Sequence, residues 1–284
     1  MPEETGPNAE EPMVDFLDDE VHFVGLASTG PSNDNLPQNL QEALNGPDAE
    51  KWSDALQEEL ENLKSNNVYE EVPTPEGVKP ITSKGVMRLK FNRNGNITRY
   101  KIRIVAQGFV QKEGVDYQEV FAPVANLESI RIIMALAAKY NLELDQMDVT
   151  AAYLNGELVE ELYMMPPDGV KIKPGHCWRL RRSLYGLKRA GRTWNKRLDQ
   201  KLRDLQFTRL NAETCLYVYK KGGGLCFLVV YVDDLLLAAT SQAFMNQVKK
   251  MLSNAYKMCD LGAAKFVLGL QIKRDRSKRT ITLS

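Results

Sequence analysis

The stretch LCFLVVYVDDLLLAA, residues 225–239, decides the fold, because two apolar runs flank a pair of acidic residues in it. Each run has the length of a buried strand. Asp233-Asp234 lies where a tight turn is expected, since Asp tolerates turn dihedrals and bonds its own backbone. The stretch therefore predicts a hairpin of two buried strands with two acids at its tip. Taken alone, such a pair is ordinary turn chemistry and indicates no function.

A second apolar strand, predicted over 146–153, contains a single acid, Asp148. Strand interiors disfavour Asp, and burying an unpaired carboxylate is costly. If this strand is a neighbour of the hairpin in one sheet, Asp148, Asp233 and Asp234 converge and need a cation. Mg²⁺ is the expected ion, with Mn²⁺ as the alternative, because it combines a few carboxylates with water and phosphate oxygens. Two such ions serve in-line phosphoryl displacement.

The remaining patterns predict an α+β class, in which helices alternate with antiparallel hairpins. Residues 1–45 are acidic and rich in Pro, Gly, Asn and Ser, so we expect a disordered lead-in. Helices are expected at about 48–66, 128–140, 188–206 and 242–256, and further hairpins at 84–106 and 265–284. The second of these helices is expected to bury Ile132, Ile133, Leu136 and Ala137.

The formal net charge of zero hides two parts of opposite sign. Residues 1–50 hold 12 of the 37 acidic residues and no Lys or Arg, which leaves the rest of the chain at +12. That charge favours a polyanionic partner, with a merely soluble basic surface as the alternative. Helical spacing places Arg189, Arg192 and Lys196 on one side of a basic stretch. A solvated helix face or a contact with nucleic-acid phosphates both account for them.

A second group of cations lies on the predicted strand 97–106. The two-residue period places Arg99, Lys101 and Arg103 on one face, opposite apolar residues. A solvated strand face is common, but three neighbouring cations repel one another, so an anionic ligand would help to explain them.

Composition argues against several classes of protein. The 284 residues are 43% hydrophobic and 26% charged, which is typical of a soluble globular chain. No apolar run is long enough to span a bilayer, and the acidic start does not resemble a signal peptide. The four cysteines form no CxxC pair, which argues against a zinc ribbon or a disulfide framework and fits a reducing compartment.

Five ordered blocks of sequence resemble the reverse transcriptase of Ty1/copia-type retrotransposons. They are RYKIRIVAQGF (99–109), VFAPV (120–124), QMDVTAAYLNG (146–156), SLYGLK (183–188) and YVDD (231–234). The last resembles the YxDD box of reverse transcriptases. The third resembles their first catalytic-aspartate motif, with an aromatic residue five positions after the acid. The resemblance covers about residues 48–284.

This resemblance implies the right-hand polymerase fold over 46–284, with a fingers hairpin at about 84–106, a palm at about 107–284 and most of the thumb missing. It implies an RNA-directed DNA polymerase that transfers a dNMP to a primer 3′-hydroxyl by two-metal chemistry. The implied partners are an RNA or DNA template with its primer, and dNTPs, without a membrane. The implied location is intracellular, either cytoplasmic in a virus-like particle or nuclear. The alternative is a truncated, inactive retrotransposon relic that at most binds nucleic acid.

The resemblance also implies roles for single residues. Asp148, Asp233 and the Val149 carbonyl would hold the metal, and Asp234 would support them. Nucleotide binding falls to Lys101, Arg103, Tyr153, Tyr185, Gly186 and Lys188, with Tyr153 as the steric gate against a ribose 2′-hydroxyl; spacing alone favours a core aromatic there. Nucleic-acid contacts fall to Tyr231, Arg189, Arg192 and Lys196. The tail segment 266–272 resembles the part that positions the primer terminus.

The chain departs from the family pattern at 189–192. It reads Arg-Ala-Gly-Arg where the family usually has Gln-Ala-Pro-Arg. Glycine in place of proline loosens the entry into the helix, because it adds chain entropy. Arg189 adds a charge in place of a neutral amide. Both changes are expected to weaken the positioning of nucleotide or template.

Overall fold

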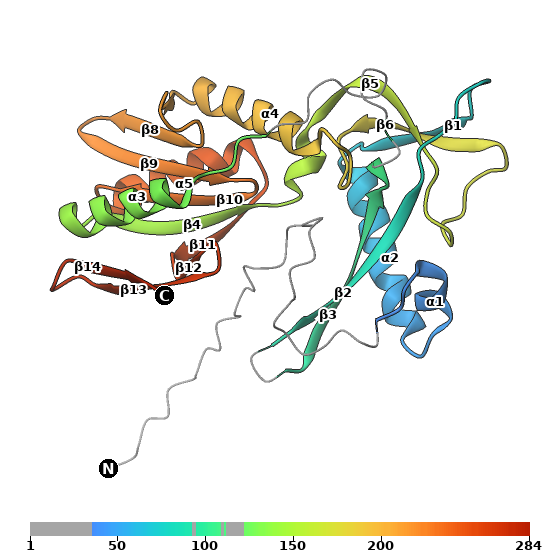
Figure 1. Ribbon diagram of the computed structural model, residues 1–284, viewed down its shortest axis with the longest axis horizontal. Coiled ribbons are helices and arrows are strands. Elements are labelled where there is room, and N and C mark those ends of the chain that lie inside the picture. Colours follow the sequence, from blue (N-terminus) through green and yellow to red (C-terminus); the bar gives the residue numbers. More distant parts are fainter. Residues whose placement is uncertain (1–35, 93–94, 109–110, 112–121) are drawn as a thin grey trace, which may run out of the picture.

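The computed structural model describes residues 36–92, 95–108, 111 and 122–284, which form two halves lying side by side (Figure 1). One half is built on a six-stranded sheet, and the other on a long helix with a β-hairpin. Most of the predicted lead-in lies outside the described residues, as do Phe109, Val120 and Phe121 of the sequence blocks.

The six-stranded sheet is antiparallel throughout. Its strands lie in the spatial order β11 (Met258–Ala263), β4 (Glu143–Val149), β10 (Asp234–Ala239), β9 (Gly224–Tyr231), β8 (Leu216–Lys221) and β7 (Thr208–Arg209). The hairpin predicted from 225–239 is β9–β10, and the strand that carries Asp148 is its neighbour. The predicted adjacency of the carboxylate-bearing segments and the α+β class are therefore confirmed.

Helices cover both faces of this sheet. On one face pack α4 (Ala190–Asp204) and α5 (Gln242–Ala255), and on the other α3 (Leu127–Tyr140). The tail lies beside α3 as a second sheet of β12 (Phe266–Val267), β13 (Leu270–Asp275) and β14 (Thr280–Leu283). In the described part of the chain, no helix is both long and apolar enough to cross a membrane.

The buried stripe of α3 differs from the prediction. Ile130, Ile133, Met134 and Ala137 are buried, whereas Ile132 is 57% exposed. With about 3.6 residues per turn, Ile132 lies on the side of the helix opposite Ile130. The helix is apolar on more than one side, so its docking onto the sheet selects the stripe and the prediction for Ile132 is wrong.

The other half is built around α2 (Ala49–Ser65), which lies along the hairpin of β2 (Ser83–Phe91) and β3 (Ile97–Ala106) (Figure 1). A three-stranded antiparallel sheet, in the order β1 (Tyr69–Pro73), β6 (His176–Arg182) and β5 (Glu157–Met164), completes it. One buried cluster joins these elements to Tyr185 and Ala190. The hairpin half and the start of α4 therefore share a core.

A short helix, α1 (Leu40–Asn45), falls within the predicted lead-in of 1–45. The Asn39 side chain caps it by accepting the Glu42 amide, and Leu40 and Ala43 are buried. The expectation of disorder is therefore wrong for residues 40–45. A helix of fewer than two turns is too short to show a period in the sequence.

The strand predicted over 146–153 ends at Val149. Ala151 has a φ of 54°, and a left-handed backbone cannot continue a strand. The chain then forms the 3₁₀ turn η2 (Ala152–Asn155), which carries Tyr153. Tyr153 therefore lies on a separate turn beyond the strand of Asp148.

Candidate active site

Asp148 and Asp234 lie directly opposite each other across the β4–β10 pair. The Val149 amide donates a hydrogen bond to the Asp233 carbonyl over 2.9 Å. The neighbouring pair, Asp148 with Asp234, is therefore of the non-hydrogen-bonded type, with Cα atoms about 4.5 Å apart and side chains close together. Two half-buried carboxylates thus share one face of the sheet at one of its ends.

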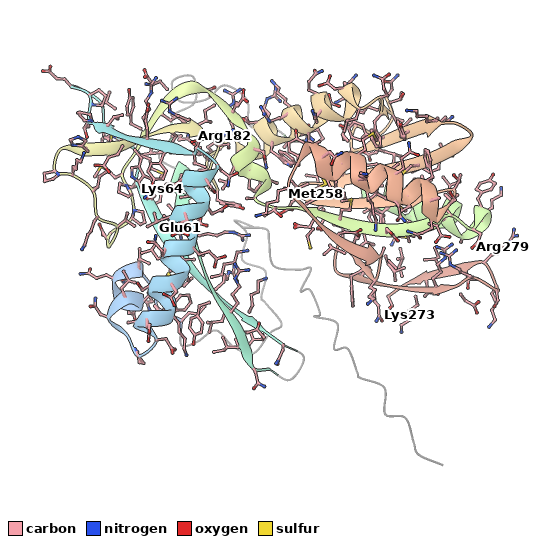
Figure 2. All side chains as sticks on the ribbon, turned by 180° about the vertical axis from the view of Figure 1, so that it is seen from behind. Glu61, Lys64, Arg182, Met258, Lys273 and Arg279 are labelled. Carbon is pink, nitrogen blue, oxygen red and sulfur yellow. The ribbon has the colours of Figure 1, made fainter. Side chains whose placement is uncertain are left out.

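The same row continues into the outer strands. Cys259 of β11 lies opposite Asp148, and Tyr231 of β9 lies opposite Asp234. Met258, which pairs with Val149, marks the end of the sheet nearest the α2 half in Figure 2. The predicted residues Asp148, Asp234 and Tyr231 are therefore brought together. Cys259 was not predicted, because only the register of β11 reveals its place.

The tip of the hairpin differs from the prediction. Val232 and Asp233 form the turn, whereas Asp234 is already the first residue of β10. Val232 has a φ of 54°, which is strained for a β-branched residue. Strain of this kind is found at functional sites, where the surrounding structure maintains it.

Trp194 supplies that support from α4. Its indole N–H donates to the Val232 carbonyl over 2.7 Å, and the side chain is buried. The bond ties the helix to the turn that holds Asp233. The sequence predicts a helix at about 188–206 that contains Trp194, but it gives this residue no role. The available signal was that a buried indole N–H needs an acceptor.

The donors at this end of the sheet fit a hard divalent cation in kind, since they are carboxylate and carbonyl oxygens. Among the residues that the structure describes, no three His, Cys, Asp or Glu side chains form a group that could hold a metal ion. Mg²⁺ usually takes one or two carboxylates and completes its shell with water and substrate phosphate. Asp148 and Asp233 therefore suit an ion bound together with a substrate better than an ion in a protein cage.

A second cluster gathers predicted nucleotide-binding residues. The Arg103 guanidinium lies over the Tyr185 ring, with Cζ 4.8 Å from the ring centroid. Tyr185 meets Tyr153 edge to face, with 5.3 Å between ring centroids. Lys101 is two residues before Arg103 and shares its face of β3. The cluster therefore joins β3, the loop 183–188 and η2.

Gly186 allows the loop to approach β3 closely. Its φ is 86°, and an added Cβ would lie 2.1 Å from the Ala106 carbonyl oxygen. The Ala106 amide donates to the Tyr185 carbonyl over 2.8 Å, which fixes the approach. Lys188 is exposed, and its amide donates to Gln111 Oε1 over 2.9 Å. The structure thus explains Gly186 by packing and leaves the Lys188 side chain at the surface.

Three of the predicted nucleic-acid cations lie at the start of α4. Arg189, Arg192 and Lys196 line a cleft of about 570 Å³ together with Glu157 and Glu160 of β5. Arg189 forms an ion pair with Glu160 of β5. The extra charge at the departure from the family pattern is therefore balanced within the chain, by a partner that sequence spacing did not reveal.

An ion triad lies on the reverse face of the sheet. Lys249 of α5 contacts Asp145 of β4 over 2.5 Å and Asp260 of β11 over 2.6 Å. Burial by itself lowers the pKa of Lys249, but the two carboxylates more than offset this and raise it above its ordinary value. The triad links the helix to the two strands that carry Asp148 and Cys259.

Comparison with known proteins gives consistent matches. The family model described as reverse transcriptase (RNA-dependent DNA polymerase) matches residues 66–284. The retrovirus-related Pol polyprotein from transposon TNT 1-94 of Nicotiana tabacum is 38% identical over 256 residues, which are 89% of this chain and 19% of that protein. The corresponding polyprotein from transposon RE1 of Arabidopsis thaliana is 33% identical, over 79% of this chain and 16% of that protein.

The chain thus spans about a fifth of the length of these relatives. Among solved structures, the foamy viral protease-reverse transcriptase in complex with double-stranded DNA gives a TM-score of 0.40 at 13% identity. That alignment covers 81% of this chain and 35% of the other.

Proposed function

The chain belongs to the reverse transcriptase (RNA-dependent DNA polymerase) family of transposon Pol polyproteins, and we propose that it transfers a dNMP from a dNTP to a primer 3′-hydroxyl. The observation that carries the proposal is the Asp148–Asp234 pair beside the Asp233 turn. Like charges directly opposite each other destabilise a sheet, so a bound cation would stabilise this pair. On this proposal the six-stranded sheet is the palm, and β2–β3 is the fingers hairpin.

The metal would be held by Asp148, Asp233 and the Val149 carbonyl, with Asp234 in support. Bound Mg²⁺, or Mn²⁺ in its place, would activate the 3′-hydroxyl and neutralise the leaving pyrophosphate. The chain itself contributes the geometry. Trp194 keeps the strained turn in place, and the β4–β10 register keeps the carboxylates on one face.

The Arg103 cluster would bind the incoming nucleotide. Lys101 and Arg103 would grip the triphosphate, since charge-assisted bonds to phosphate are strong. Tyr185 contacts both the Arg103 guanidinium and the Tyr153 ring. Tyr153 would then lie under the sugar and exclude a ribose 2′-hydroxyl. Gly186 and Lys188 would complete the pocket.

Template and primer, as RNA or DNA, would bind through Tyr231 in the catalytic row and through the cations of α4. Arg189, Arg192 and Lys196, which line one cleft, would contact the phosphates, and Arg189 is also held by its ion pair with Glu160. An intracellular site of action, cytoplasmic or nuclear, belongs to the same proposal.

The purified chain, tested with poly(rA)/oligo(dT) and dTTP, should incorporate nucleotide when Mg²⁺ is present. Excess chelator should abolish incorporation, and added Mg²⁺ should restore it. The alternative is a protein that binds nucleic acid without synthesis, which the departures at Arg189 and Gly191 favour. It predicts salt-sensitive binding of the template-primer with no extension under any metal condition. That result would refute the proposed activity.

A further inference from the structure

Helix α2 ends at Ser65, immediately before the region 66–284 that the family model matches. It nevertheless packs along the β2–β3 hairpin over much of its length (Figure 1). The hairpin would otherwise be a two-stranded ribbon, and such ribbons are marginally stable by themselves. The contacts between α2 and the hairpin therefore affect the position of β3, the strand that carries Lys101 and Arg103.

The first group of contacts involves Tyr100, which faces α2 from β3. Trp52 meets the Tyr100 ring edge to face, with 4.8 Å between centroids. The Lys51 ammonium lies 5.0 Å from the same centroid. At the neighbouring position, Glu58 forms an ion pair with Arg99. These contacts fix the part of β3 that precedes Lys101, but they are partly exposed and of ordinary kinds.

The second contact is made by Glu59, which is only 7% exposed in an otherwise apolar core cluster. Its Oε1 accepts the backbone amide of Ile104 over 3.1 Å. Burial raises the pKa of Glu59, although the Ile104 amide and the charges of Arg103 and Lys101 act in the opposite direction. A buried acid is a costly way to fill a core position, so the specific bond to β3 needs an explanation.

The position of the Glu59–Ile104 hydrogen bond in β3 explains it. Ile104 directly follows Arg103, whose guanidinium lies over Tyr185, which in turn contacts Tyr153. Glu59 thus holds the backbone of β3 at the point from which this series of contacts begins. An apolar residue in its place would preserve burial but would not specify the register of the strand.

We infer that α2 is a brace for the hairpin and that Glu59 is a positioning residue, which fixes β3 so that Lys101 and Arg103 meet the triphosphate of the incoming nucleotide. The inference rests on the proposed function. It extends the nucleotide site to a helix that lies outside the matched region and contains none of the nucleotide-contacting residues.

Three variants of the whole chain test the brace. Glu59→Ala removes the acceptor, Glu59→Gln keeps an acceptor oxygen without the charge, and Glu61→Gln changes an exposed acid of the same helix (Figure 2). Two measurements are made on each. One is amide hydrogen exchange over residues 97–106, and the other is steady-state incorporation with dTTP as the varied substrate.

Glu59→Ala should exchange faster over 97–106 and raise the KM for dTTP about tenfold, with kcat within about twofold, because nucleotide positioning is lost and the catalytic carboxylates are intact. Glu59→Gln should stay close to the wild type in both the exchange rate and the KM, because it keeps an acceptor oxygen. Glu61→Gln should match the wild type. A Glu59→Ala protein with wild-type exchange, or with faster exchange and an unchanged KM, overturns the inference. If the wild type makes no DNA, the proposed function fails by itself, and the exchange data still decide whether Glu59 fixes the hairpin.

Discussion

Replacing Gly186 by Ala tests whether the loop 183–188 and β3 form one rigid unit. The new Cβ would lie 2.1 Å from the Ala106 carbonyl oxygen and 2.6 Å from Val105 Cγ1, well inside contact distance. A left-handed φ of 86° adds about 1–2 kcal/mol for a residue with a side chain. Relieving the clash requires repacking, at about 1–3 kcal/mol, and the loss of the Ala106–Tyr185 hydrogen bond, at about 0.5–1.5 kcal/mol. The expected loss of unfolding free energy is about 2.5–6.5 kcal/mol.

Gly77→Ala is the matched control. Gly77 has a φ of 76° and no atom within 4 Å of an added Cβ, so only the backbone strain of about 1–2 kcal/mol applies. Urea unfolding followed by tryptophan fluorescence measures both losses. Gly186→Ala should also raise the KM for dTTP, because the Arg103 guanidinium packs on the ring of Tyr185, the residue before Gly186. Equal losses of stability in the two variants would refute the close approach of loop and strand.

Three further substitutions address single contacts. Trp194→Phe leaves the Val232 carbonyl without its donor, so stability should fall by about 1–3 kcal/mol and the rate of incorporation should fall as well; an unchanged rate contradicts the support given to the turn. Gly191→Ala should raise the unfolding free energy by about 0.5–1 kcal/mol, because the new methyl group meets neighbours only at ordinary distances of 3.4 Å or more; a loss in the same urea titration contradicts this. Lys249→Met should cost about 3–5 kcal/mol by leaving Asp145 buried without its cation. Because the pKa of Lys249 is raised in the folded state, the stabilisation is present at neutral pH and is lost as pH rises through that pKa; equal stability of Lys249→Met and wild type at pH 7 contradicts the role of the triad.

Local signals were enough to predict the hairpin and the place of Asp148. Long apolar runs and a strand acid are properties of short windows, and the adjacency of the two segments needed only the assumption of one sheet. Helix α5 was expected at about 242–256 and spans Gln242–Ala255, because its apolar stripe has a clear period. The family resemblance then supplied the roles, which patterns alone did not.

Several errors have one physical cause, which is that tertiary docking selects among local options. Ile132 belongs to an apolar helix whose buried side is set by the sheet. Ala151 adopts a left-handed φ that no propensity indicates, and this moves Tyr153 out of the strand. Asp234 belongs to β10 because the turn lies one residue earlier than predicted and includes Val232, whose side chain is unsuited to its positive φ.

Partners distant in sequence were beyond a reading of the sequence alone. Glu160 lies 29 positions before Arg189, and Glu59 lies 45 positions before Ile104, so neither pairing leaves a trace in spacing. Glu59 lies among the apolar positions of its helix, and a polar residue on a buried stripe is a signal that could have been followed.

The most direct test of the catalytic carboxylates is the single-turnover rate of dTMP incorporation by Asp148→Asn beside the wild type and Asp168→Asn, an exposed acid outside the site. Binding of the template-primer, measured by fluorescence anisotropy, should be alike in all three proteins. Since loss of a residue that merely supports a metal ligand costs about 10–100-fold, loss of a ligand should lower the rate by more than about a hundredfold. Asp168→Asn should match the wild type. Incorporation by Asp148→Asn at close to the wild-type rate would contradict the account.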